Sequence, residues 1–101
     1  MRVQWTKQAE RQLKEIFDYY SSEAGSRVAG KMVTRIIDRV SMLENNPLAG
    51  PIEELLNDYP EQYRYLVESH YKIIYWTNQG VITISAVFDC RQNPKKMEDE
   101  L

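Results

Sequence analysis

Cysteine is nearly absent from this sequence, since Cys90 is the only one among 101 residues. A single thiol cannot form a disulfide within the chain, and it cannot supply a cysteine-rich zinc site. Long apolar runs are also missing, so we find neither the apolar segment of a signal peptide nor a membrane span. These absences predict a cytoplasmic protein that does not associate with a membrane.

An excess of positive charge is missing as well. The chain has 13 Lys and Arg against 15 Asp and Glu, for a formal net charge of −2. Proteins that bind nucleic acid gain much of their affinity by neutralising phosphates, and they usually carry a positive excess. The charge balance therefore favours protein partners, although it leaves room for a local basic patch.

The acidic residues do not have the spacing of metal ligands. They are spread over the first predicted helix among Lys and Arg, and three more follow one another at Glu98, Asp99 and Glu100. We interpret both sets as solvated surface, and we expect neither a metal nor a cofactor.

Two amphipathic helices account for the first half of the chain. Apolar residues recur at steps of three and four within residues 9–24 and again within residues 28–43. Thr6 is a suitable N-cap for the first helix, and Gly25 can end it because glycine adopts positive φ without strain. The short link between the helices predicts a helical hairpin. The chain length is that of a single domain, which we expect to span residues 1–101.

Strands account for most of the rest. Alternation predicts a short strand at residues 2–5, and three further strands at residues 63–68, 71–77 and 81–89. Links of two or three residues between the last three strands permit only antiparallel neighbours. A short polar helix is predicted from Pro94 to the C-terminus. The sequence thus predicts an α+β fold, β-α-α-β-β-β, in which the helical hairpin packs on one face of an antiparallel sheet.

Alternation along the last strand also predicts which side chains share a face. Ile82, Ile84, Ala86 and Phe88 are expected to point toward the helical hairpin, because they occupy every second position. The third strand is apolar on both faces, which predicts a central strand whose second face is partly covered by the tail or by a partner.

Five segments, in this order, resemble the RelE/ParE toxins of bacterial type II toxin–antitoxin systems. They are Leu43–Gly50 (LENNPLAG), Arg64–Val67 (RYLV), Tyr71–Tyr75 (YKIIY), Val81–Ile84 (VITI) and Val87–Pro94 (VFDCRQNP). Each segment alone is a weak signal, and their order and spacing make the resemblance specific.

The resemblance implies a partner and one of two activities. Family members are neutralised by a small cognate antitoxin whose disordered segment folds on the toxin, so we expect a hetero-oligomer of toxin and antitoxin or a homodimer. ParE-like members bind DNA gyrase and trap its cleaved complex. RelE-like members instead cut mRNA on the ribosome without a metal.

The residues that cleave RNA in the RelE branch are only partly matched. Arg64, Lys72 and Arg91 occupy basic positions of that pattern, but Leu66 stands where a second lysine is frequent, and Met97 stands where a tyrosine is frequent. Arginine remains protonated and cannot serve as a base, and Lys72 could do so only with a strongly lowered pKa. We therefore expect a ParE-like gyrase inhibitor, with a ribosome-dependent mRNA endonuclease as the alternative and an inactive antitoxin-binding member as a third hypothesis.

The candidate site residues follow from these hypotheses. Arg64, Lys72 and Arg91 are the catalytic candidates if the chain is a nuclease, and with Trp76 they are the candidates for binding a partner. We expect the three cations to gather on the open face of the sheet. Arg64 and Lys72 could equally be solvated surface residues. His70, the only histidine, is interpreted as a residue of the turn between two strands.

Overall fold

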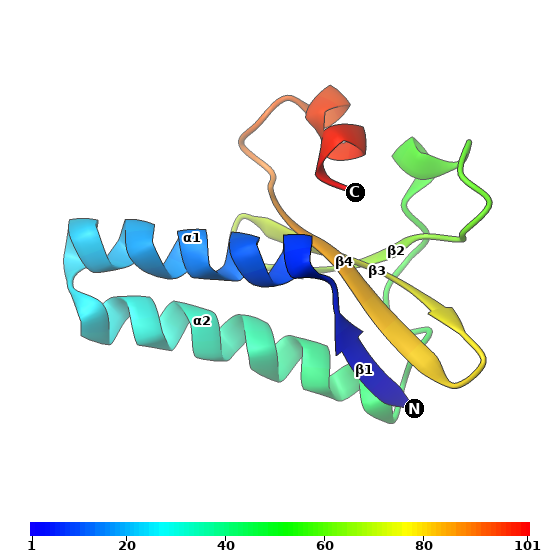
Figure 1. Ribbon diagram of the computed structural model, residues 1–101, viewed down its shortest axis with the longest axis horizontal. Helices are drawn as coiled ribbons and strands as arrows, with labels where there is room; N and C mark the ends of the chain where they lie inside the picture. The colour runs from blue at the N-terminus through cyan, green and yellow to red at the C-terminus, as the bar shows by residue number, and fades with distance from the viewer.

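The structure, a computed structural model, describes residues 1–101 (Figure 1). Its elements in chain order are β1 (Arg2–Trp5), α1 (Lys7–Ala24), α2 (Ser26–Ser41), the 3-10 helices η1 (Met42–Glu44) and η2 (Glu54–Leu56), β2 (Arg64–Glu68), β3 (Tyr71–Asn78), β4 (Val81–Asp89) and the C-terminal 3-10 helix η3 (Pro94–Glu100). This order confirms the predicted α+β fold. None of the helices is both long enough and apolar enough to cross a membrane.

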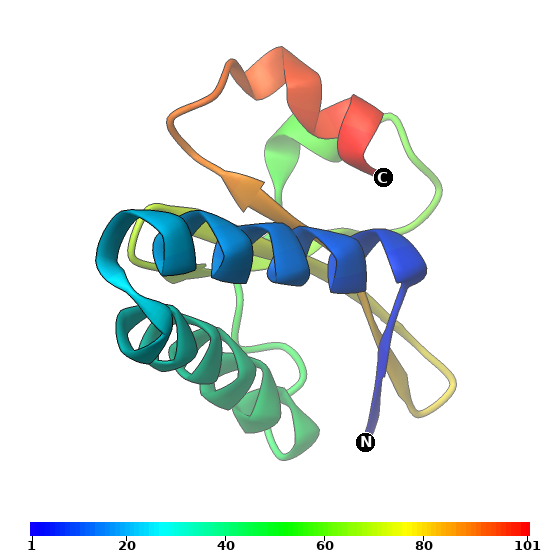
Figure 2. The same cartoon turned by 60° about the vertical axis from the view of Figure 1, so that its left-hand side comes forward.

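The helical hairpin forms as its caps predict. The Thr6 hydroxyl accepts a hydrogen bond from the amide of Ala9 at 3.1 Å, which satisfies one free N–H of the first turn of α1. Gly25 ends α1 with a φ of 92°, a conformation that favours glycine. The two helices therefore run back along each other, and they lie side by side in both views (Figures 1 and 2).

The sheet has the strand order β1-β4-β3-β2. The pairs β2–β3 and β3–β4 are antiparallel, as the short links require. The first strand differs from the expectation: β1 pairs with β4 in parallel, from Arg2 opposite Val81 to Trp5 opposite Ile84. The sheet is therefore mixed. The parallel pairing is possible because the helical hairpin and two strands separate β1 from β4, and parallel neighbours require such a long connection.

A β-bulge interrupts β4. The register pairs Ile74 with Ala86 and Tyr75 with Ile84, so Ser85 is an extra residue opposite no residue of β3. A bulge of this kind reverses the alternation of side chains along the strand that contains it.

The bulge corrects the predicted faces of the last strand. Ile82 and Ile84 lie in the apolar cluster under the helical hairpin, as expected. Ala86 and Phe88 lie in a second cluster on the opposite face of the sheet, so the prediction that all four share one face is wrong. Strand β4 contributes side chains to both apolar clusters, because the extra residue Ser85 reverses the alternation of the side chains that follow it.

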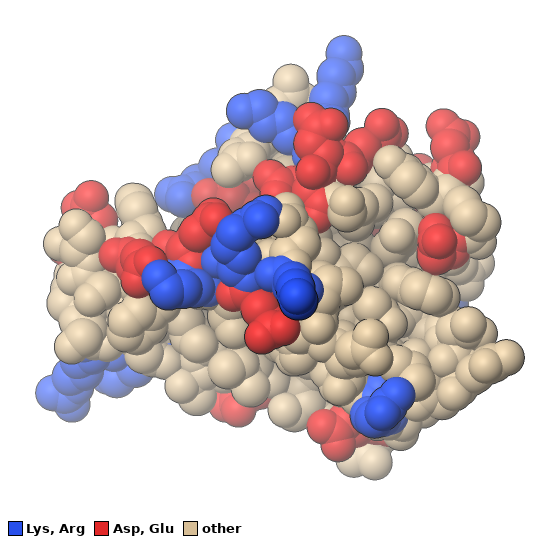
Figure 3. Space-filling model, viewed as in Figure 1, with Lys and Arg blue, Asp and Glu red and all other residues tan.

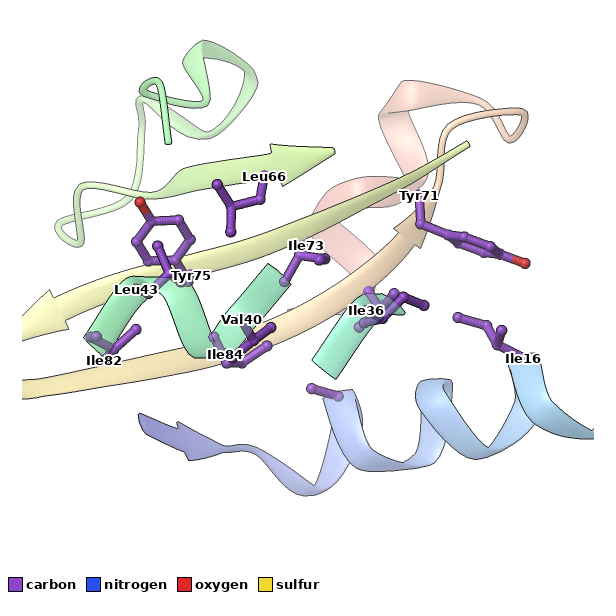
Figure 4. Close-up of a cluster of buried hydrophobic side chains, with 12 residues drawn as sticks. Ile16, Ile36, Val40, Leu43, Leu66, Tyr71, Ile73, Tyr75, Ile82 and Ile84 are labelled. Carbon is purple, nitrogen blue, oxygen red and sulfur yellow. The ribbon is translucent and has the colours of Figure 1, made fainter. Parts of the chain in front are cut away.

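The apolar core is therefore divided by the sheet into two clusters. The larger one joins the hairpin to the inner face of the sheet (Figure 4), and its buried members are Ala9, Ile16, Ile36, Val40, Leu43, Leu66, Tyr71, Ile73, Tyr75, Ile82, Ile84 and Val87. The smaller one lies on the outer face and consists of Leu56, Tyr63, Ile74, Ala86, Phe88 and Met97. Leu56 belongs to η2 and Met97 to η3, so both of these helices cover the outer face of β3. Of the two covers that the sequence left open, the tail or a partner, the structure shows the tail.

Candidate functional site

Arg64 lies at the start of β2 and holds the loop before it. Its guanidinium donates a hydrogen bond to the carbonyl of Gly50 at 2.9 Å and another to the Gln62 side chain at 3.4 Å. The amide of Gly50 in turn donates to the buried Tyr75 hydroxyl at 2.9 Å. Burial raises the pKa of Tyr75, so its hydroxyl remains protonated at neutral pH. Arg64 therefore contributes to a local hydrogen-bonded network around Gly50.

Lys72 lies in the middle of β3 and forms an ion pair with a buried carboxylate. Its Nζ is 2.6 Å from Oε2 of Glu53 and 4.3 Å from the centre of the Tyr65 ring. The Glu53 side chain is 4% exposed, and its other oxygen accepts a hydrogen bond from the amide of Leu55 at 3.2 Å. Because a buried carboxylate without a countercharge is costly, Glu53 holds the Lys72 ammonium firmly.

The strand register places Arg64 and Lys72 on opposite faces of the sheet. Arg64 lies opposite Tyr75, whose ring is in the cluster under the hairpin, whereas Lys72 lies opposite Val67 and Phe88. Directly opposed residues of neighbouring strands point to the same face. The expectation that the three cations gather on one open face is therefore wrong. The pairing of β2 with β3 directs the side chains of Arg64 and Lys72 to opposite faces of the sheet.

Arg91 lies just beyond the end of β4 and pairs with Asp89. Its Nη2 is 2.8 Å from Oδ2 of Asp89, and its Nε is 3.1 Å from Oδ1. The side-chain hydrogen bonds from Arg91 lower the pKa of Asp89, and the backbone N–H of Arg91 adds to this effect. The Arg91 side chain remains 58% exposed. It is the most accessible of the three predicted cations, since Lys72 is only 23% exposed and Arg64 is also partly buried.

An open cavity of about 320 Å³ lies beside Arg91, between α1, the end of β4 and the tail. Its lining includes Gln12, Tyr19, Tyr71, Arg91 and Glu100. Burial raises the pKa of Tyr71, and its hydrogen bond with Tyr20 acts in the same direction. The Tyr71 hydroxyl is thus protonated at neutral pH and does not act as a base there.

Trp76 lies on the outer face, at the far end of β3 from Arg91. It is partly exposed and packs against the outer apolar cluster. A shallow hollow of about 300 Å³ lies beside it, lined also by Pro60, Glu61 and Gln62. Trp76 is therefore both a core residue and an accessible aromatic surface, which is the property of an anchor residue in protein interfaces.

His70 lies in the turn between β2 and β3, as predicted. It is half-buried: Nε2 is 3.3 Å from the Tyr20 hydroxyl, and the ring lies 4.3 Å from that of Tyr71. These contacts give His70 a packing role in the turn of the β2–β3 hairpin.

Sequence reasoning missed the groups that engage the cations and the tail. Glu53 and Asp89 are the carboxylate partners of Lys72 and Arg91. Gln12 is buried in α1, where its oxygen accepts a hydrogen bond from the Val87 amide at 2.7 Å and its nitrogen donates to the Glu100 carboxylate. A polar residue within the apolar stripe of α1 is the one signal that could have indicated Gln12. No group of three or more His, Cys, Asp or Glu is placed to hold a metal ion.

Comparisons with known proteins agree with this fold. No curated protein matches the chain by sequence. A solved structure described as "Chromosomal ParDE TA system from P. aeruginosa" is similar to it, with a TM-score of 0.74 and 23% identity over 88% of this chain and 95% of that chain. The sequence model described as "ParE toxin of type II toxin-antitoxin system, parDE" matches residues 3–94. Because that match spans most of the chain, the protein belongs to the ParE toxin family of type II toxin–antitoxin systems.

Proposed function

We propose that this toxin acts by binding DNA gyrase and trapping its cleaved complex with DNA, and that a cognate antitoxin of the ParD kind neutralises it. The observation that carries the proposal is the match of residues 3–94 to the ParE toxin family. On this proposal the toxin is an inhibitor and catalyses no reaction of its own.

The state of the three cations supports an inhibitor over an mRNA endonuclease. A nuclease needs cations that are free to stabilise the crowded phosphate, together with a group that can carry protons. Arg64 is bonded to the Gly50 carbonyl and Lys72 to the buried Glu53, so only Arg91, which is 58% exposed beside Asp89, remains accessible. Separating Lys72 from Glu53 would leave a buried carboxylate uncompensated, at a cost of about 3–5 kcal/mol.

We place the gyrase contact at Arg91 and Trp76, the accessible members of the predicted set. Arg91 offers a guanidinium at the end of β4, and Trp76 offers an aromatic face beside a hollow. Arginine and tryptophan are the residue types that contribute most to protein interfaces. Arg64 and Lys72 would support this surface from within, by holding the Gly50 loop and the Glu53 segment in position.

The contribution of the Arg91 side chain to gyrase binding can be separated from the effect of removing one positive charge. We expect Arg91→Gln to raise the toxin concentration needed to accumulate gyrase-cleaved DNA by about tenfold or more, as the loss of an interface anchor does. Arg11→Gln is the matched control, since Arg11 is 63% exposed and also pairs with a carboxylate, Glu15. Equal potency of the wild type and Arg91→Gln would remove Arg91 from the interface.

The antitoxin contact is proposed where the hairpin meets the edge strand. A hollow of about 400 Å³ is lined by Trp5, Glu10, Leu13 and Ile37. It lies beside β1, whose outer edge has no strand neighbour and can accept an added strand. Apolar side chains of a segment that folds on binding would fill this hollow.

The antitoxin site is tested by two substitutions on α2. Ile37 and Val28 are both 43% exposed, but only Ile37 lines the hollow. We expect Ile37→Glu to abolish co-purification with the protein encoded by a short neighbouring reading frame, whereas Val28→Glu should retain it. Loss of co-purification in both variants, or in neither, would place the antitoxin elsewhere.

A further inference from the structure

The net charge of the chain conceals a strongly uneven distribution. Helix α2 carries Arg27, Lys31, Arg35 and Arg39 against the single carboxylate Asp38, which gives the helix a net charge of +3. Since the whole chain has a net charge of −2, all remaining residues together carry −5. In Figure 3, basic side chains project at the lower left, where α2 begins, and acidic side chains lie at the upper right, near η2. Residues 53–61 around η2 carry Glu53, Glu54, Asp58 and Glu61 and no Lys or Arg.

Three of these cations form a ridge along one side of α2 and have no carboxylate partner. Arg27, Lys31 and Arg35 are all exposed and follow one another at steps of four residues. None of them takes part in the five ion pairs of the structure, whereas Arg39, the next in the row, pairs with Glu68. Helix α1 differs in this respect, because its Arg11 and Lys14 pair with carboxylates of the same helix.

The ridge borders a shallow hollow without any apolar residue. The hollow measures about 470 Å³ and is lined by the three cations together with Gly30 and Thr34. Gly30 has no side chain, and a Cβ built there would touch nothing within 4 Å, so a ligand can approach the helix backbone closely. Thr34 adds a hydroxyl that can donate a hydrogen bond.

The chemistry of the ridge fits a phosphodiester backbone better than a protein segment. Stable protein interfaces have an apolar or aromatic centre, which this hollow lacks. Contacts to the backbone of a duplex are made by Arg, Lys and hydroxyl groups and need no apolar surface. The rise of about 1.5 Å per helical residue separates Arg27 from Arg35 by about 12 Å along the axis. One strand of a duplex presents three to four phosphates over about that length.

We propose that the ridge of Arg27, Lys31 and Arg35 binds the phosphate backbone of a DNA duplex without regard to base sequence. The inference goes beyond gyrase inhibition and is measured in the absence of gyrase. The acidic residues around η2 lie on the opposite side of Figure 3 from the start of α2, so docking would be oriented with α2 toward the duplex. The overall negative charge predicts weak binding that is confined to low salt.

The test is the salt dependence of binding, measured by fluorescence anisotropy with a short labelled DNA duplex and an RNA duplex of the same sequence. Three phosphate contacts predict a slope of about −2.7 in log K against log salt for DNA, or a loss of about 40-fold between about 50 and about 200 mM salt. The triple variant Arg27→Gln, Lys31→Gln, Arg35→Gln should abolish binding and its slope. Glutamine has a helix propensity close to that of Lys and Arg, so α2 should remain folded.

The matched control removes three exposed cations from α1: Lys7→Gln, Arg11→Gln, Lys14→Gln. Both triple variants have the same net charge, so retained binding in the α1 variant would assign the effect to the ridge. Tighter binding to the RNA duplex than to the DNA duplex would contradict the assignment to DNA. The proposal would be overturned if the wild type bound neither duplex at low salt, if both triple variants lost binding equally, or if a polyglutamate peptide bound more tightly than either duplex.

Discussion

At the scale of single residues, Gly50 is the one glycine at which a side chain would have no room, because it lies against strand β2. A Cβ at this position would lie 2.3 Å from the carbonyl oxygen of Tyr65 and 2.9 Å from the Tyr75 hydroxyl. The first of these neighbours is backbone and cannot move without disturbing the strand. The sequence indicates Gly50 only as a turn residue before Pro51, because the neighbours that exclude a side chain come from residues 65 and 75.

Gly50→Ala should therefore destabilise the protein. We expect a loss of about 1–3 kcal/mol in the free energy of unfolding, as for other cases of overpacking, measured by urea denaturation. Gly30→Ala is the control, because its added methyl group meets nothing and alanine favours the helix by about 1 kcal/mol. If Gly50→Ala stabilised the protein as Gly30→Ala is expected to do, the close packing described at Gly50 would be incorrect.

Asp89 is a second residue whose role can be measured, through pH. The hydrogen bonds from Arg91 lower its pKa in the folded protein below the ordinary value of about 3.9. The ionised pair therefore stabilises the fold above that ordinary value, and the contribution is lost as the pH falls through the lowered pKa of the folded state. We expect Asp89→Asn to reduce stability at neutral pH and to flatten the acid decline of stability below about pH 4. Parallel curves for the wild type and the variant would show that the pair does not stabilise the fold.

At the scale of elements, the helices and strands follow from local signals. Thr6 and Gly25 set the ends of α1, and the structure places β4 at the residues that alternation predicts. The bulge at Ser85 and the parallel pairing of β1 were not predictable in this way. Both depend on which strand lies beside β4, and a pattern of alternating residues contains no information about its neighbour.

The C-terminal tail is the element whose contribution to stability is easiest to test. Met97 is 1% exposed within the outer cluster, whereas Met42 at the end of α2 is 44% exposed. We expect Met97→Ala to cost about 2–5 kcal/mol of unfolding free energy, and Met42→Ala to change it by less than about 0.5 kcal/mol. Chemical denaturation of both variants checks this.

The same two variants also test whether η3 covers the outer face of the sheet in solution. If η3 covers the sheet, Met97→Ala should also increase the binding of a hydrophobic dye such as ANS, since Ile74 and Phe88 lose their cover. Equal stability of the two variants would mean that the tail is detached from the sheet in solution.

At the scale of the whole molecule, the sequence predicted the family and the order of elements but not the arrangement of the candidate site. Arg64 and Lys72 have apolar neighbours in the sequence of their strands, but burial does not alternate strictly there, since Ile73, Ile74 and Tyr75 are all buried. Whether the side chains of Arg64 and Lys72 share a face of the sheet depends on the pairing of Arg64 with Tyr75, and this pairing is known only from the assembled sheet. The partners Glu53 and Asp89 likewise come from a loop and a strand end, where periodicity gives no signal.

The distribution of charge is also a property of the whole molecule. The total charge of the sequence is −2, but the fold separates the basic helix α2 from the acidic residues around η2. Arg91 and Trp76, the residues proposed to contact gyrase, lie on other elements than the α2 ridge. The hollow proposed for the antitoxin includes Ile37 of α2 but none of the three cations of the ridge.

The central claim is that the protein inhibits gyrase and does not cut RNA. It is tested most directly by adding the same purified protein to gyrase with plasmid DNA and, in parallel, to translating ribosomes. We predict that cleaved plasmid accumulates in the first reaction in proportion to toxin, and that the messenger RNA in the second remains intact. Unimpaired supercoiling at saturating protein, together with transcripts cut in the ribosomal A site, would contradict the account.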